Sequence, residues 1–209
     1  MARKGIKARA TSRKAVKAQS DYSLFKALAP RMMRDLMRDF SPLADFQAAG
    51  AVGNGGGESG GFTQIQEKNP TVPGSKGGYG FFQWTGMGSV AKPGRRRVFE
   101  NLLKARRLGP DSYDANYEML KGELKTSEKA TIPKLRTAKN LDEATLFFMI
   151  AFERPGNPHL EGRIEWSRMA LAAYAAEEKK IAKDPPIVAK LAIKPAPGSP
   201  RYRGNPAPQ

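Results

Sequence analysis

The sequence predicts a mainly helical domain over residues 42–178, with a glycine-rich loop inside it and a basic extension at each end. Apolar residues recur at three- and four-residue steps over most of this range, which is the spacing of one helix face. Charge separates the domain from its extensions. Residues 1–41 carry 11 Lys and Arg against three acids and residues 179–209 carry seven against one, whereas residues 42–178 carry 18 against 16. Most of the net charge of +16 is therefore terminal.

Composition excludes several classes of protein. There is no cysteine and a single histidine, His159, so disulfides, thiolate metal sites and a Ser-His type triad are not expected. We expect neither a metal nor a cofactor. No apolar run reaches the roughly 20 residues that span a bilayer. The N-terminus lacks the apolar segment of a secretory signal peptide, so any action outside the cytoplasm needs another route of delivery.

The extension at residues 1–21 is predicted to be a disordered basic tail. Residues 1–20 hold seven basic residues, no acid and no aromatic residue, and such a segment buries too little apolar surface to order itself. Its charge suits nucleic acid, anionic lipid or an acidic protein of an assembly. It equally suits a tail that only solubilises, and the sequence does not separate these interpretations.

Residues 22–41 are predicted to form an amphipathic helix with a methionine-rich apolar face. Phe25, Met32, Leu36 and Phe40 follow helical spacing, with charged residues between them. Packing on the neighbouring domain is the favoured interpretation of this face. An adaptable docking surface and contact of helix 22–40 with a membrane are the alternatives, the membrane being the less favoured.

The next helix is predicted to begin at Ser41-Pro42, an N-cap residue followed by proline at the first helical position. Three glycines, at 55–57, should end or fray this helix, because each costs about 1 kcal/mol in a helix interior. Glu58 would then lie at the C-terminal lip. The negative end of the helix dipole and partial burial both favour a protonated carboxyl there, as a proton donor requires.

A glycine- and proline-rich stretch, residues 60–84, is predicted to be a long loop or small β-hairpin. So much bare backbone beside a carboxylate suits a bulky substrate that lies close to the main chain. Helical spacing returns afterwards, and a Lys- and Pro-rich tail follows over 179–209. The expected helices cover residues 95–108, 113–124, 131–138, 140–151 (opened by a capping box of Asn140 and Glu143) and 160–174.

The order of these motifs resembles the lysozyme superfamily, most closely phage tail-type lysozymes and more distantly soluble lytic transglycosylases. The resemblance covers roughly residues 44–175. The motifs that carry it are Gly53-Asn54, Glu58-Ser59-Gly60, Gly78-Tyr79-Gly80, Gln83-Trp84-Thr85-Gly86, Arg96 or Arg97, and Phe152-Glu153-Arg154-Pro155-Gly156. Gly55 to Gly57 depart from it, since relatives usually keep helix-forming residues there.

The resemblance implies an α+β lysozyme-like fold and an enzyme that cleaves peptidoglycan between N-acetylmuramic acid and N-acetylglucosamine. Glu58 matches the catalytic acid, and Gln83 matches a residue that binds the sugar or a water molecule. Ser59, Tyr79 and Trp84 are the other candidate substrate-binding residues. Because aromatic residues dominate protein cores, each aromatic could pack in the core instead.

A second carboxylate is the open point of the predicted site, because glycosidases usually use two. Glu67 lies in the loop, while Glu153 belongs to one of the family-like motifs and is the better candidate. A structural ion pair of Glu153 with Arg154 or Arg163 is the competing interpretation. If no second carboxylate reaches the groove, Glu58 alone could act as acid and then base, which gives the 1,6-anhydro product of a lytic transglycosylase.

The leading functional prediction is a virion-borne enzyme that a phage particle delivers to the periplasm and cell wall. Its basic tails would then contact virion proteins or DNA. A basic structural or internal virion protein on the same fold, without activity, is the main alternative, since a fold does not fix a function. A membrane-active protein that works through helix 22–40 is the third.

Overall fold

The computed structural model describes residues 22–70, 72–156 and 158–184. The chain divides into two compact units, Met1–Ala175 and Ala176–Gln209. The described part of the second unit, residues 176–184, consists of the last turns of a helix and the residue that follows it. The predicted tail at 1–21 and all of the predicted C-terminal tail beyond residue 184 lie outside the described residues.

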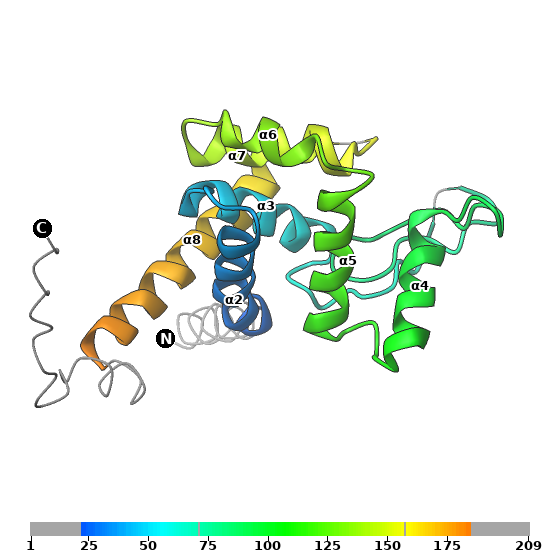
Figure 1. The fold of residues 1–209 in the computed structure, drawn as a ribbon, viewed down its shortest axis with the longest axis horizontal. Helices are drawn as coiled ribbons and strands as arrows, with labels where there is room; N and C mark the ends of the chain where they lie inside the picture. The colour runs from blue at the N-terminus through cyan, green and yellow to red at the C-terminus, as the bar shows by residue number, and fades with distance from the viewer. Residues whose placement is uncertain (1–21, 71, 157, 185–209) are drawn as a thin grey trace, which may run out of the picture. The chain divides into compact units, whose positions relative to one another are not determined.

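The described chain is mainly helical, which confirms the predicted fold class (Figure 1). Its elements are α2 (Ser23–Asp39), α3 (Asp45–Glu58), α4 (Arg95–Arg106), α5 (Tyr113–Lys125), α6 (Thr131–Arg136), α7 (Leu141–Phe148), the π-helix η1 (Met149–Glu153) and α8 (Leu160–Lys183). Among them, no helix is both long and apolar enough to cross a membrane.

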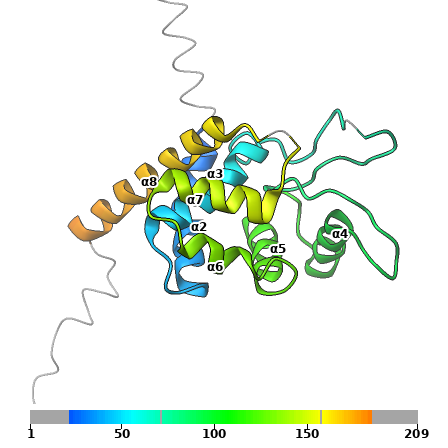
Figure 2. The same ribbon diagram turned by 90° about the horizontal axis from the view of Figure 1, so that it is seen from above.

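Helix α3 is the centre of the first unit, and α2, α7 and η1 all pack against it (Figures 1 and 2). Its residues from Gln47 to Gly56 are buried without interruption. Glycine makes this burial possible: a Cβ on Gly50 would lie 2.7 Å from the backbone of Ala144 in α7, and one on Gly56 would lie 2.6 Å from the ring of Phe25 in α2. The neighbouring helices therefore lie against the α3 backbone itself.

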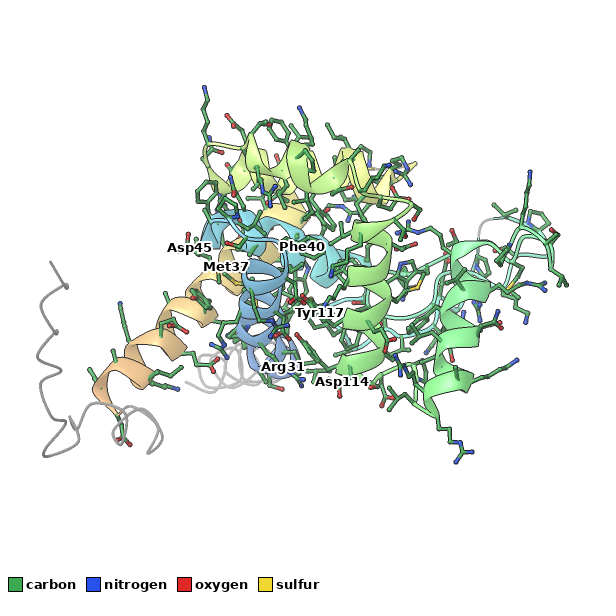
Figure 3. All side chains as sticks on the ribbon, in the orientation of Figure 1. Arg31, Met37, Phe40, Asp45, Asp114 and Tyr117 are labelled. Carbon is green, nitrogen blue, oxygen red and sulfur yellow. The ribbon has the colours of Figure 1, made fainter. Side chains whose placement is uncertain are left out.

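Helix α2 buries the apolar face that its spacing predicted. Phe25, Met32, Met33 and Leu36 have no exposed surface and join the same core as α3. Its polar side meets α5, where Arg31 forms an ion pair with Asp114 at 2.8 Å (Figure 3). The methionine-rich face is thus occupied by this chain's own core.

A second set of polar contacts between α2 and α5 is centred on Asp39. Its carboxylate accepts hydrogen bonds from the Arg38 guanidinium at 2.9 and 3.0 Å and from the Tyr117 hydroxyl at 2.9 Å. Lys121 lies 2.8 Å away. The hydrogen bonds from Arg38 are the main reason that the pKa of Asp39 lies well below its ordinary value.

We expect Asp39→Asn to destabilise the protein by about 1–2 kcal/mol at pH 7, since it removes charge-assisted hydrogen bonds while Arg38 remains partly screened by solvent. A depressed folded-state pKa contributes stability above the unfolded value of about 3.9, and this contribution is lost as pH falls through the folded value. Urea unfolding between pH 7 and pH 2 should therefore show a shallower acid loss in the variant. An unchanged slope would contradict this assignment.

Several predicted boundaries are wrong, each for a packing reason. The helix expected at Ser41-Pro42 begins at Asp45, where the Gln47 side chain accepts a hydrogen bond from the Ala44 amide. It then continues through 55–57 to Glu58, because the packing of the buried Gly55 and Gly56 against the rings of Phe82 and Phe25 outweighs the poor helix propensity of glycine. Residues 179–183, which were expected to belong to the C-terminal tail, are the last residues of α8.

Helix α4 ends at Arg106, two residues before the predicted end of this helix. Val98 and Leu108 are more than one-third exposed, whereas Phe99 is fully buried. Among its described residues, the stretch 59–94 holds only isolated antiparallel bridges, such as Gln66 with Tyr79 and Tyr79 with Trp84. It is therefore the long loop of the prediction, folded back on itself.

Candidate active site

Glu58 is the last residue of α3, and the chain turns sharply just after it. Ser59 caps the helix: its hydroxyl donates to the Gly55 carbonyl at 2.8 Å and accepts from the Phe62 amide at 3.1 Å. Gly60, Gly61 and Phe62 all have positive φ, which glycine adopts without strain. This turn leaves the Glu58 side chain partly exposed, at 21%, while Ser59 beside it is buried.

The Glu58 side chain opens into a groove of about 740 Å³. Most of the lining comes from residues 63–69, in the loop that follows α3, and the rest comes from Gly78, Gln83 and Thr85. The lining is mostly polar, as expected for a ligand rich in hydroxyl and amide groups. It comprises Glu58, Thr63, Gln64, Ile65, Gln66, Glu67, Lys68, Asn69, Gly78, Gln83 and Thr85.

The groove wall is held in place by the buried guanidinium of Arg96, at the start of α4. It donates to the carbonyls of Lys76 and Gly77, the second at 2.8 Å, and to the Gln66 side chain at 2.8 Å. Glu67 braces the same wall, since its Oε2 accepts from the Gly78 amide at 2.8 Å. The polar lining is therefore built on fixed backbone.

Arg163, on α8, is the ion-pair partner of Glu58. Its Nη2 donates to Glu58 Oε1 at 2.5 Å, and its side chain is only 7% exposed. The guanidinium also donates to Asn54 Oδ1 at 3.1 Å and to the Pro158 carbonyl at 2.9 Å. Asn54 is itself fixed, because its amide donates to the carbonyls of Gly50 and Thr145. Buried groups on three elements thus determine where the Glu58 carboxylate lies.

Glu153, at the end of η1, carries a second carboxyl group close enough to Glu58 to feel its charge. Although the residue as a whole is half-buried, its Oε1 is enclosed and has no hydrogen-bond partner among the described residues. Burial, and then the charge of Glu58, raise the pKa of Glu153 well above its ordinary value. Arg154, the partner considered for it, instead binds Glu128 at 2.8 and 3.0 Å.

We expect Glu153→Gln to stabilise the protein at pH 7. A raised folded-state pKa means that folding takes up a proton, so Glu153 costs stability that grows as pH rises from its unfolded value of about 4.3 towards the folded value. A neutral amide of the same size removes that cost. Thermal unfolding at pH 4 and pH 8 should show the gain mainly at pH 8; a loss of stability there would contradict the assignment.

Of the predicted site residues, the groove contains Glu58 and Gln83. The Gln83 amide nitrogen donates to the carbonyls of Gln64 and Gly80 at 2.8 and 2.7 Å, so its carbonyl oxygen is the part left to accept from a ligand. Glu153 is not part of the groove lining. Glu67, the weaker candidate from sequence, does line the groove.

The other three predicted substrate contacts do not line this groove. Ser59 and Trp84 are fully buried: Ser59 caps α3, and the Trp84 indole donates to Glu123 at 2.7 Å. Tyr79 packs against Arg96 and Phe99 and faces a different hollow of the surface. Large aromatic rings contribute most to a core, so Trp84 lies inside it and the half-buried Tyr79 packs against it, while polar residues line the groove.

Sequence reasoning missed most of the groove and the role of Arg163. The loop 63–69 carries no recognisable motif, although its run of amide, hydroxyl and charged side chains is a weak signal of a polar wall. Arg163 lies 105 residues from Glu58 in the chain, and only the fold brings them together. In the described part of the chain no cluster of three His, Cys, Asp or Glu residues could hold a metal ion.

The family model described as phage tail lysozyme matches residues 40–174. No curated protein and no solved structure shows a significant match. The matched range starts at the end of α2, includes the groove and ends within α8.

Proposed function

The chain belongs to the phage tail lysozyme family, and we propose from this that its groove binds a glycan strand of peptidoglycan and cleaves the bond between N-acetylmuramic acid and N-acetylglucosamine. The observation that carries the proposal is Glu58. It is a carboxyl group on a rigid helix end, partly shielded from solvent, at the edge of a polar groove. Catalytic groups placed by a rigid scaffold at a loop are typical of enzyme sites.

In the proposed reaction Glu58 donates a proton to the glycosidic oxygen as the bond from the sugar carbon to that oxygen breaks. This step leaves a carboxylate on Glu58, the ionised form that pairs with Arg163 in the structure, and the side chain must take up a proton from water before the next cycle. Arg163 lies 2.5 Å from that carboxylate and is too buried and too well bonded to move away. It therefore stabilises the charge that forms on Glu58 as the proton leaves, and preorganised groups of this kind lower the barrier.

Glu67 favours hydrolysis over transglycosylation, because it is a second carboxylate in the same groove. Its Oε2 is bound by the Gly78 amide, which fixes the side chain and leaves Oε1 for the substrate or a water molecule. In this role Glu67 activates the water that adds to the sugar or stabilises the positive charge that develops on the ring. Glu153 has no direct role in this proposal, since its Oε1 is enclosed and the residue does not line the groove.

Mass spectrometry of the fragments released from purified peptidoglycan tests this assignment. We expect fragments that end in reducing N-acetylmuramic acid, and we expect Glu67→Gln to slow their release by about 10²-fold or more. Fragments that end in a 1,6-anhydro sugar would show that the enzyme is a lytic transglycosylase and not a hydrolase. Absence of any cleaved glycan from the folded protein would favour the alternative, a structural virion protein on this fold.

We further propose that the enzyme is carried in the virion and acts on the host cell wall, as the name of its family implies. The basic extensions would contact virion proteins or nucleic acid, since most of the net charge of +16 lies there. Binding of the full-length protein to DNA at 50 and 200 mM salt tests whether the extensions contact nucleic acid. A nucleic-acid role requires a steep loss of affinity with salt.

A further inference from the structure

A second hollow, of about 310 Å³, lies beside Glu58. Glu58 is the residue that lines both this hollow and the main groove. The other lining residues are Gly57, Pro155, His159, Gly162, Arg163 and Trp166. We call it the α8 pocket, because α8 supplies Gly162, Arg163 and Trp166.

Two glycines keep the α8 pocket open. A Cβ on Gly57 would lie 3.1 Å from Arg163 Cγ and 3.7 Å from the Trp166 indole, so a side chain there would fill the floor. A Cβ on Gly162 would meet nothing within 4 Å. Gly162 is exposed and lies on the first turn of a long helix, where glycine is a poorer helix former than most other residues.

Trp166 gives the α8 pocket an aromatic wall. Its ring packs edge-on against Tyr22 and Phe25, at centroid distances of 4.9 and 4.8 Å, which holds the indole in one orientation. The residue is half-buried, so part of the ring remains open to the pocket. A fixed, partly exposed indole offers a flat apolar surface beside the polar groups of a ligand.

We propose that the α8 pocket binds the sugar ring of the glycan strand that lies on the far side of the cleaved bond from the main groove, with Trp166 as its apolar platform. This inference rests on the proposed function: a polymer cut in its interior continues on both sides of the acid that protonates the bond. Glu58 lines both hollows, so a strand that occupies both would pass this side chain.

A sugar ring suits the α8 pocket better than the carboxylates of a peptide stem. The buried cation of the pocket, Arg163, already binds Glu58, Asn54 and the Pro158 carbonyl. An added carboxylate would also lie near that of Glu58, which is unfavourable. A pyranose ring instead matches the apolar surfaces of Trp166 and Pro155 and leaves its hydroxyl groups to water and His159.

Gly162→Leu tests the proposal, because it fills the α8 pocket from a position where nothing lies within 4 Å. The matched control is Gly122→Leu, on the exposed side of α5, where again nothing lies within 4 Å. Both changes replace glycine in a helix by a better helix former, so neither should weaken the fold. Calorimetry would measure binding of peptide-free glycan strands to each change in a full-length Glu58→Gln background.

We expect Gly162→Leu to weaken this binding at least tenfold and Gly122→Leu to leave it unchanged. In enzyme with Glu58 intact, Gly162→Leu should raise KM for the same strands. If the Gly162→Leu protein and its control bind the strands with equal affinity, the α8 pocket does not bind a sugar ring, but the proposed function is unaffected. If neither the Gly122→Leu control nor the unaltered protein binds and cuts the strands, the proposed function itself is wrong. If the Glu58→Gln protein binds strands that carry peptide stems but not peptide-free strands, the assignment of the pocket to a sugar ring is wrong.

Tryptophan fluorescence gives an independent readout, since the chain has two tryptophans and Trp84 is fully buried. Adding glycan strands to the Glu58→Gln protein should change the emission through Trp166. The change should disappear in Trp166→Phe, which keeps a flat ring in the core contacts with Tyr22 and Phe25. An emission change that persists in Trp166→Phe would contradict contact between the sugar and Trp166.

Discussion

Replacing Glu58 by Gln should lower kcat for peptidoglycan cleavage by about 10²–10⁴-fold, the usual contribution of a general acid. The amide keeps the size of the side chain and can still accept a hydrogen bond from Arg163, but it has no acidic proton for the glycosidic oxygen. Release of soluble fragments from purified peptidoglycan, at saturating substrate, measures the loss. KM should change much less, because the lining of the groove stays intact.

The matched control is Glu118→Gln, the same chemical change in an exposed ion pair with Arg106 on the surface. It should keep full activity and cost no more than about 1 kcal/mol. Thermal unfolding must accompany both variants, since Glu58→Gln removes the charge that pairs with the buried Arg163. A folded Glu58→Gln protein that cleaves at the rate of its control would remove Glu58 from the mechanism.

The second large effect is expected from Gly53→Ala, which should cost about 3 kcal/mol or more, at or above the upper end of the overpacking range. The added Cβ would lie 2.0 Å from Ser167 Oγ, 2.4 Å from its backbone nitrogen and 2.5 Å from its Cα. Helices α3 and α8 would have to separate. Because Arg163 lies on the same stretch of α8, activity should fall together with stability.

Gly122→Ala is the control for Gly53→Ala, and it should stabilise the protein by up to about 1 kcal/mol, since nothing lies within 4 Å of its Cβ. Removing the Ser167 hydroxyl in the Gly53→Ala protein should restore little, because backbone atoms of Ser167 remain in the way. Denaturant unfolding measures each cost. A Gly53→Ala protein as stable as its control would show that α3 and α8 are not in close contact.

The same glycines explain how far sequence reasoning reached into the fold. Helical spacing located the elements from α2 to α8, because a buried face leaves a regular pattern. It failed on the last turn of α3, where intrinsic propensity predicts an end and the helix continues to Glu58. Gly55 and Gly56 lie there against the rings of Phe82 and Phe25. Such a contact between distant segments cannot be read from local spacing.

The candidate site was predictable where a motif stood in the sequence and unpredictable where the fold assembled it. Glu58 and Gln83 stand in motifs, and both line the groove. Trp84 also stands in a motif, yet its ring is buried beside Glu123, because an apolar ring gains more from the core than from an open groove. Glu67 was the weaker candidate from sequence and lines the groove, whereas Arg163 became identifiable as the partner of Glu58 only through the fold.

The most direct test of the central claim is a crystal structure of the Glu58→Gln protein with a peptide-free glycan strand. We predict that the strand occupies the groove lined by Gln83 and Glu67. One glycosidic oxygen should lie within hydrogen-bonding distance of the side chain at position 58. A strand bound elsewhere on the protein, with this groove empty of sugar, would contradict the account.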